Sequence, residues 1–419
     1  VCGISTIAAH LNTRTIDGHC DCMMFINSYG WATKDVGALI APRPLLIAQS
    51  DRDGLNQVES VREIFQDLSA FYEKLGVPDN ISYIETPGGH SYHQKSRQGI
   101  FSFFMKHLMD QEVRPEEVGD IDESPGSLFS NDELRVYTDG PPEDDITTTI
   151  QDSFIALPAA KEPDNMDMLR SYTEKVKSSL RQKTFHNFPG SEVPLDPELI
   201  FRTADYAPHG GEKYLINTED GWKLKATIYW RNPKSEKKPM MVVLRNPNEP
   251  RNDSERFNYQ LHDQWNVMVI DVRGVGESGW SQDLHWHARR ASAWSGRTIA
   301  SMRVYDLLRF LEFARTLPEV DVSKIGIAAR GELGVVALYG ALLDGNCHTI
   351  VLDNPPPTQN VVSNKDGRGE AIEMLNCLQI TDVNQLPALI QPTQTVFVGA
   401  MPESYQWSLN TLNSIGKTE

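Results

Sequence analysis

The sequence has 419 residues, of which 40% are hydrophobic and 23% are charged. This composition is typical of globular proteins, and the length allows two or three domains. The formal net charge of −17 argues against nucleic acid or an anionic membrane as a partner, because a surface that binds phosphates must be basic. No apolar run approaches the roughly 20 residues of a transmembrane helix.

The first informative stretch begins with an apolar run at residues 45–48, which predicts a buried parallel strand. The run ends in a polar turn that carries two acids, Asp51 and Asp53. Apolar residues then recur at steps of three and four over residues 58–75, which predicts an amphipathic helix. A second predicted strand, residues 81–86, leads into a Pro-Gly-Gly-His turn that precedes another amphipathic helix.

The histidine that ends this second turn is His90. Groups at the carboxyl ends of neighbouring parallel strands face one crevice, so His90 can meet an acid that follows the first strand. A carboxylate bonded to one imidazole nitrogen fixes the tautomer and supports positive charge on the ring, as a general base requires. We therefore predict a catalytic pair of Asp53 and His90, with Asp51 as the reserve acid. The alternative is that Asp53 only caps the helix that begins near Asn56.

A compact group of potential metal ligands, which includes His19, Cys20 and Cys22, lies further upstream. Structural zinc sites usually present ligand pairs separated by two to four residues, with a second pair further on. This segment has neither feature, so we expect no metal and no cofactor. The five cysteines are an odd number and do not resemble a disulfide scaffold.

The nucleophile that should precede such an acid and histidine is missing. An α/β-hydrolase presents its serine in a Gly-x-Ser-x-Gly turn between a strand and a helix, before the acid. Ser5 and Ser28 lack glycines at that spacing. We expect the serine to lie upstream of Val1 and residues 1–112 to be the C-terminal half of a catalytic domain, inactive as this fragment alone.

Residues 113–198 are expected to form a connector, because an acidic run with Pro and Gly begins after residue 112. Within it, residues 134–137 and 146–155 are candidate strands. Residues 164–183 are predicted to form a helix.

A second α/β domain is predicted over residues 199–419, from an antiparallel strand at residues 222–230 followed by further strands and helices. The predicted buried strands are 240–244, 267–270, 325–329, 350–353 and 395–399, and the predicted helices are 304–316 and 335–343. At the position of a nucleophile turn the sequence has Gly331 beside Glu332, and Glu403 and Ser404 stand where an acid is expected. We therefore expect this domain to be non-catalytic.

An aromatic stretch between two strands of this domain leaves two interpretations open. It could form a platform for sugars, or its tryptophans could be buried at a domain contact. The residues concerned are Trp280, His285, Trp286, His287 and Trp294.

These residues together resemble bacterial acetyl xylan esterase-like proteins of the α/β-hydrolase superfamily, in their tandem-domain form. In the first domain the resemblance depends mainly on the distinctive Asp-Gly-His-Cys-Asp-Cys-Met segment. The segments that carry it are 17–23, 38–48, 50–53 and 89–90 in the first domain, and 303–306, 318–321 and 330–334 in the second.

The resemblance implies an α/β fold with doubly wound, mostly parallel sheets, one partial and one degenerate, joined by the acidic connector. It implies a serine esterase that removes acetyl or similar acyl groups from carbohydrate without a metal, with Asp53 as the acid and His90 as the base. The partners would be an acylated carbohydrate or small ester and an N-terminal fragment that carries the serine. The second domain would act as a lid, a wall or a carbohydrate-facing platform, and the protein would be secreted or periplasmic.

A different class of function remains an alternative. The chain could be a non-catalytic carbohydrate-binding or scaffolding protein built from two decayed hydrolase folds, as Gly331 and the missing serine suggest.

Overall fold

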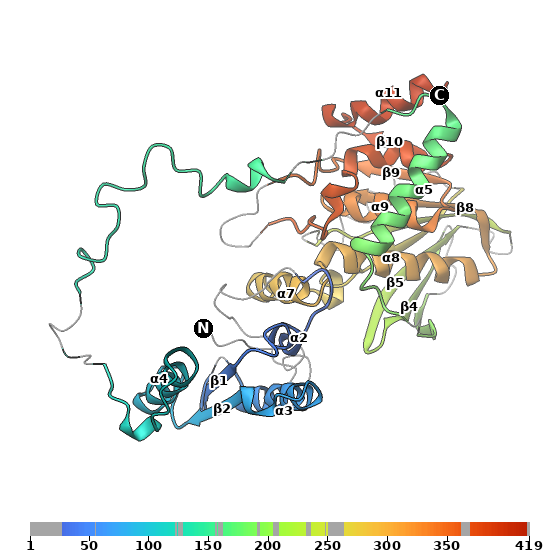
Figure 1. The fold of residues 1–419 in the computed structure, drawn as a ribbon. Helices are drawn as coiled ribbons and strands as arrows, with labels where there is room; N and C mark the ends of the chain where they lie inside the picture. The colour runs from blue at the N-terminus through green and yellow to red at the C-terminus, as the bar shows by residue number, and fades with distance from the viewer. Residues whose placement is uncertain are drawn as a thin grey trace. The chain divides into compact units, whose positions relative to one another are not determined.

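The chain divides into two units, each of which is described by itself (Figure 1). Unit 1 comprises Val1–Phe25 and Trp31–Ala156, and unit 2 comprises Ile26–Gly30 and Leu157–Glu419. The computed structural model describes residues 27–54, 56–121, 124, 129–155, 157, 162–190, 193–203, 209–231, 236–247, 249, 264–361 and 369–416. Ser5 and the group of His19, Cys20 and Cys22 lie outside the described residues.

Unit 1 contains a parallel pair of strands, β1 (Leu45–Ser50) and β2 (Ile81–Thr86), with helix α3 (Val58–Lys74) between them in the chain. Helix α4 (Gln94–Met109) follows β2 and packs on both strands. The predicted order of strand, helix, strand and helix is therefore confirmed. The shorter elements are α2 (Thr33–Ala38), η1 (Pro78–Asn80) and η2 (Pro115–Glu117).

Helix α3 has the amphipathic pattern that its sequence predicts. Its buried side chains include Ile64, Leu68 and Tyr72, which pack with Ile81 at the start of β2. The Tyr72 hydroxyl donates a hydrogen bond to a backbone carbonyl oxygen at 2.9 Å, so its polar end is satisfied.

The strands of unit 1 are less buried than central strands of a parallel sheet usually are. The four apolar residues at the start of β1 are only half-buried, and no described strand pairs with the second edge of β1. On α4, Phe104 and Leu108 are exposed rather than packed. Fully apolar parallel strands are normally covered on both faces and both edges, so the apolar surface of β1 is available for a further strand.

The connector contradicts two of the predicted strands. Residues 134–137 form turns and bends, and residues 146–155 form turns and a short helix, η3 (Ile150–Ser153). Short strands need a partner to pair with, and these segments are exposed to solvent. The predicted helix is confirmed as α5 (Met166–Lys183), whose first turn is capped by the Asn165 side chain.

Unit 2 contains an eight-stranded sheet in the order β10-β9-β8-β6-β7-β5-β4-β3. The five strands from β10 to β7 are parallel, and β5, β4 and β3 continue the sheet in antiparallel pairs. Its strands are β3 (Glu198–Arg202), β4 (His209–Glu219), β5 (Trp222–Arg231), β6 (Lys238–Leu244), β7 (Asn266–Ile270), β8 (Val320–Arg330), β9 (Thr349–Asp353) and β10 (Gln394–Val398).

The helices of unit 2 include all those predicted after residue 300. They are η4 (Gly276–Ser278), α7 (Gln282–Trp294), α8 (Ile299–Thr316), α9 (Leu333–Asp344), η5 (Cys377–Gln379), η6 (Val383–Gln385), α10 (Leu386–Leu389), η7 (Glu403–Tyr405) and α11 (Gln406–Ser414). The sequence did not predict β3, β4, α7 or α11.

The core of unit 2 lies on both faces of its central strands. Alternate residues of β6 point to opposite faces, so Val242 joins a large cluster with α5, α8 and α9, while Val243 joins a smaller cluster. Strand β7 is buried throughout. This arrangement confirms an α/β fold with a mostly parallel sheet.

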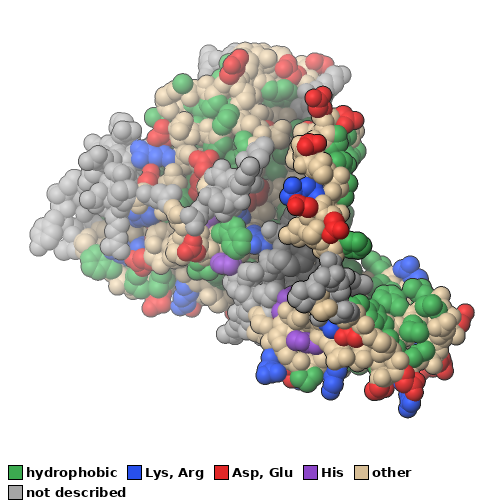
Figure 2. Space-filling view, turned by 90° about the vertical axis from the view of Figure 1, so that its left-hand side faces the viewer, with side chains coloured by type: hydrophobic (Ala, Val, Ile, Leu, Met, Phe, Trp, Pro, Cys, Tyr) green, Lys and Arg blue, Asp and Glu red, His purple; other side chains and the backbone are tan. Residues whose placement is uncertain are grey.

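The surface carries charges of both signs. On the face shown in Figure 2, acidic and basic side chains are interspersed rather than gathered in separate areas. No helix among the described residues combines the length and the apolar character that a membrane span requires.

Candidate active site

Asp53 and His90 are brought together at the carboxyl ends of β1 and β2. Asp53 Oδ2 lies 2.9 Å from His90 Nδ1. The Asp53 side chain is 6% exposed, whereas that of His90 is 54% exposed. Because an ionised carboxylate can only accept hydrogen bonds, this contact places a proton on Nδ1. The other ring nitrogen, Nε2, is then the atom that can take a proton from a nucleophile.

Asp53 does not cap helix α3. That helix begins at Val58, and its N-cap residue, Gln57, makes no capping bond through its side chain. Asp53 Oδ1 instead accepts a hydrogen bond from the backbone N–H of Asn56 at 3.1 Å, one turn before the helix. The carboxylate therefore closes the turn after β1 and still presents Oδ2 to His90.

The reserve acid, Asp51, contacts the backbone of the histidine turn. Its Oδ1 accepts a hydrogen bond from the N–H of Gly88 at 2.8 Å. The N–H of Arg52 donates to the carbonyl oxygen of Gly88 at 2.9 Å, which ties the two turns together a second time. Asp51 thus holds the segment that carries His90.

The histidine turn also requires a glycine. Gly88 has a φ of +139°, and a Cβ at this position would lie 2.1 Å from Nε2 of His93. The His93 ring therefore packs directly on the backbone of Gly88, and its Nε2 bonds to the carbonyl oxygen of Gly89 at 3.1 Å. A side chain at residue 88 would displace the ring and shift the turn.

Unit 2 has the backbone of a nucleophile turn without a nucleophile. Gly331 lies between β8 and α9 and has a φ of +51°, a left-handed conformation that favours glycine. Because β6 connects to β7 on one side and β8 lies on its other side, the chain reverses direction across the sheet between β6 and β8. Ligands of open α/β sheets bind at such a switch point, and Gly331 stands there.

Charged side chains occupy this switch point. Arg330 contacts Asp353 at 2.8 Å and Glu249 at 3.3 Å. Asn246 follows β6, and its Nδ2 donates to the carbonyl oxygen of Arg330 at 3.4 Å. These contacts link the ends of β6, β8 and β9 to one another, where a catalytic domain would hold a serine and its substrate.

Glu332, next to Gly331, is also engaged in structural contacts. Its Oε1 accepts from Arg303 Nη1 at 3.1 Å, and its Oε2 accepts from the N–H of Ala371 at 2.9 Å. Arg303 is almost completely buried and also donates to the carbonyl oxygen of Arg273. Glu332 is therefore held by a buried guanidinium rather than placed to replace a nucleophile.

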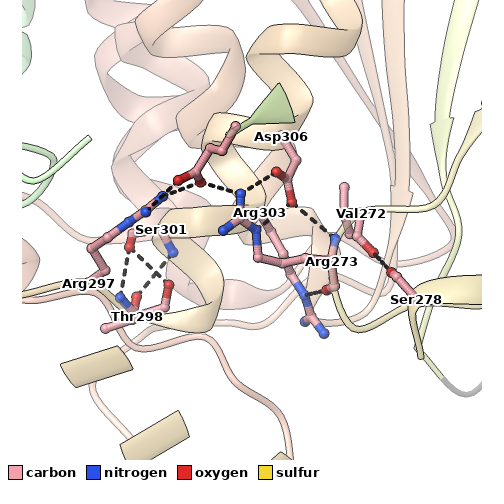
Figure 3. A network of polar contacts seen from close by, with 9 residues as sticks. Val272, Arg273, Ser278, Arg297, Thr298, Ser301, Arg303 and Asp306 are labelled. Atoms are coloured by element: carbon pink, nitrogen blue, oxygen red, sulfur yellow. Dashed lines mark hydrogen bonds and ion pairs between the residues drawn. The ribbon is translucent and has the colours of Figure 1, made fainter. Parts of the chain in front are cut away.

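A second buried ion-pair network lies beside this one (Figure 3). Arg273 contacts Asp306 at 2.6 Å and Glu219 at 2.5 Å, and Arg297 contacts Glu219 at 2.6 Å. Burial raises the pKa of Glu219, but the hydrogen bonds and charges of Arg297 and Arg273 outweigh it and lower the pKa to about 2. The network joins β4, the turn after β7 and helix α8.

The aromatic stretch belongs mainly to helix α7 and the turn before it. Trp280 Nε1 donates to His285 Nδ1 at 3.0 Å. Burial lowers the pKa of His285, and the charge of Arg303 adds to this effect. Trp294 is buried, so it belongs to the core of unit 2 and is not available to stack on a sugar.

The end of the chain supplies no catalytic acid or base in the described residues. Ser404 donates to the carbonyl oxygen of Pro357, and Glu403 is exposed to solvent. Helix α11 follows them, with no further strand or histidine among residues 399–416. The described part of the chain also holds no group of three or more His, Cys, Asp or Glu side chains suited to a metal ion.

Sequence reasoning placed Asp53 and His90 correctly next to each other but missed the residues that support them. Asn56 and Gln49 contact Asp53, and His93 packs on the histidine turn. One signal was available for Asn56, because a carboxylate often accepts from a backbone N–H three residues further on.

Comparisons with known proteins identify the fold. No family model matches the sequence, and no curated protein matches it. A solved structure of a candidate acetyl xylan esterase from Bacteroides fragilis is 12% identical, with a TM-score of 0.52, and the match covers 62% of this chain and 76% of that one. The chain has an α/β-hydrolase fold.

Two other solved structures are more distant in shape. Acetyl xylan esterase 1 from Thermoanaerobacterium is 17% identical with a TM-score of 0.40, over 61% of this chain and 86% of that one. A glucuronoyl esterase from Solibacter usitatus is 11% identical with a TM-score of 0.43, over 62% of this chain and 86% of that one.

The match with the Bacteroides structure must include unit 2. It covers 62% of the chain, whereas unit 1 ends at Ala156, before the midpoint of the sequence. The α/β-hydrolase likeness therefore extends to the unit whose nucleophile position is Gly331.

Proposed function

We propose that the natural protein is a serine carboxylic-ester hydrolase that removes acetyl or similar acyl groups from carbohydrate. The observation that carries this proposal is the 2.9 Å contact between Asp53 and His90 after two parallel strands. The name of the Bacteroides structure, an acetyl xylan esterase, supports the choice of an acyl group on carbohydrate.

In this proposal His90 is the general base and Asp53 orients it. The serine hydroxyl attacks the acyl carbon while His90 Nε2 takes its proton, and His90 then returns the proton to the leaving sugar oxygen. A water molecule, deprotonated in the same way, releases the acid and restores the serine. Backbone N–H groups beside the serine would hold the oxyanion, and each such donor contributes on the order of 3 kcal/mol.

We place the serine on a strand that precedes residue 1 and pairs with β1. In the α/β-hydrolase order the nucleophile comes before the acid, and the second edge of β1 has no partner among the described strands. A strand at this edge would bring the turn that follows it to the same end of the sheet as Asp53 and His90.

For unit 2 we propose a non-catalytic role as a lid, wall or carbohydrate-binding platform. Gly331 offers no oxygen nucleophile, and the ion pairs of Arg330 occupy the switch point beside it. If the serine is absent from the natural protein, this role extends to the whole molecule as a carbohydrate-binding or scaffolding pseudo-hydrolase. The proposed partners are then acylated carbohydrates, in a secreted or periplasmic protein, and neither nucleic acid nor a membrane.

The test uses the natural full-length product of the gene. It should hydrolyse an acetyl ester such as p-nitrophenyl acetate and should react with a fluorophosphonate, which labels activated serines. His90→Ala should lower the turnover by about 10³-fold or more. The matched control is His107→Ala, near the C-terminal end of α4, which should keep full activity. Unchanged turnover in His90→Ala would exclude His90 as the base.

A further inference from the structure

Asn56 contacts the carboxylate of Asp53 through two separate donors. Its backbone N–H donates to Oδ1 at 3.1 Å, and its side-chain Nδ2 donates to Oδ2 at 3.3 Å. Asn56 is 5% exposed, so water does not readily replace either bond. The same oxygen, Oδ2, also receives His90 Nδ1 at 2.9 Å.

Gln49 stands behind Asn56 and holds it in place. The Gln49 side-chain nitrogen donates to the carbonyl oxygens of Ser50 and Asn56, at 3.0 and 2.9 Å, and lies 3.4 Å from Asp53 Oδ2. An amide nitrogen has two hydrogens, and the two shorter bonds account for both. Gln49 therefore acts mainly on the backbone of the turn, and Asn56 acts on the carboxylate.

The two bonds from Asn56 have different consequences. The backbone bond to Oδ1 closes the turn after β1 and would persist with any side chain at residue 56. The side-chain bond is not needed for that turn, because it ends on the oxygen that faces His90. With one donor on each oxygen, the carboxylate cannot rotate about its Cβ–Cγ bond, and Oδ2 stays directed at Nδ1.

We infer that Asn56 is a positioning residue for the Asp53–His90 pair, and that its side-chain amide keeps Oδ2 directed at His90 Nδ1. Its importance for catalysis depends on the proposed esterase function. The effect on the His90 ring does not depend on it, because both contacts lie within this chain.

The test reads the His90 ring directly by NMR, on the whole chain with ¹⁵N-labelled histidine. His90→Gln identifies the signals of this ring. In the wild-type protein the ring should be the Nδ1–H tautomer, with a downfield Nδ1–H proton that exchanges slowly with water. In Asn56→Ala that proton should exchange about tenfold faster, the equivalent of one lost hydrogen bond to a charged group.

Two variants serve as controls. Asn80→Ala removes an asparagine of the same unit that donates only to the carbonyl oxygen of Pro42 in the described contacts, and it should leave the His90 signals unchanged. Asn56→Gln keeps an amide donor and should restore part of the slow exchange. A folded Asn56→Ala protein with wild-type Nδ1–H exchange would overturn the inference and leave Asn56 a structural residue of the turn.

Activity separates this inference from the proposed function. In the full-length product, Asn56→Ala should lower kcat about tenfold with little change in KM. If the wild-type product has no esterase activity but the Nδ1–H exchange changes as expected, the proposed function fails and the positioning role stands. If the product is active and Asn56→Ala changes neither kcat nor the exchange, only the positioning role fails.

Discussion

Asp53 Oδ2 and His90 Nδ1 lie 2.9 Å apart although 37 positions separate the two residues in the sequence. The register of the parallel strands explains this proximity. Ser50, the last residue of β1, pairs with Thr86, the last residue of β2, so the two turns begin at the same level of the sheet. Asp53 follows three residues after the first strand end, and His90 follows four residues after the second.

Asp53→Asn should keep the shape of the pair but reverse its chemistry. The amide can present an N–H toward His90 Nδ1, which favours the tautomer with the proton on Nε2 and removes the basic nitrogen from the nucleophile. In a serine hydrolase such a change costs about 10⁴-fold in kcat, which is measurable with an acetyl ester and the full-length product. Asp67→Asn, at a surface pair with Lys34, is the control and should be neutral.

Asp51→Ala should behave differently, because Asp51 holds backbone rather than the imidazole. It removes the acceptor of the Gly88 N–H, so unit 1 should lose about 2 kcal/mol of stability. Thermal unfolding measures this loss, and amide exchange at Gly88 should become faster. The folded variant should keep most of its esterase activity. A loss of activity as large as that of Asp53→Asn would instead make Asp51 the acid.

The sequence predicted those parts of the fold that depend on local patterns. Apolar runs such as residues 240–244 and 267–270 became buried parallel strands, and the steps of three and four residues over 58–75 became α3. Strands β3 and β4 were missed because they are edge strands or neighbours of the edge, and every residue of β3 is exposed. Their pairing depends on other strands more than on their own pattern.

The candidate site was predictable to the same extent. Asp53 and His90 follow two predicted strands, so the order of elements was enough to bring them together. The contacts of Gln49, Asn56 and His93 depend on the exact path of two turns, which periodicity does not specify. The same reason explains the connector, where the threonines around residue 148 suggested a strand but no partner strand is present among the described residues.

Glu219 predicts how the stability of unit 2 depends on pH. Its pKa is about 2 in the folded protein and near the ordinary value of 4.5 when unfolded. Because the folded pKa is lower, the unfolded state binds the proton first, so this stabilisation is complete above about pH 4.5 and is lost as the pH falls toward 2. Urea unfolding followed by Trp fluorescence at pH 7, 4 and 3 should show this decline.

Glu219→Gln provides the comparison for that measurement. It should lower the stability at pH 7 by about 2 kcal/mol, because Arg273 and Arg297 lose a charged partner. It should also flatten the decline between pH 4.5 and 2. Glu198→Gln, at an exposed pair with Lys223, should alter neither quantity. A decline in Glu219→Gln as steep as in the wild type would assign the acid sensitivity to other groups.

Gly331→Ser tests whether unit 2 retains any hidden catalytic capacity. A serine at this φ of +51° is strained, and its Cβ would lie 3.3 Å from Asn246 Nδ2, so the variant should lose about 1–3 kcal/mol of stability. Gly345→Ser is the matched control, because it has a φ of +71° with open space around the new Cβ. Chemical denaturation should show a loss at residue 331 equal to or larger than that at residue 345.

The decisive readout is reaction with a fluorophosphonate. A serine needs an imidazole within hydrogen-bond reach to become nucleophilic. Arg330 and its partners occupy the space beside residue 331, and the strand β10 is followed by α11 instead of a turn with a histidine. Gly331→Ser should therefore remain unlabelled and inactive toward acetyl esters. Labelling of the new serine would show that unit 2 still contains a base, and its proposed non-catalytic role would then be wrong.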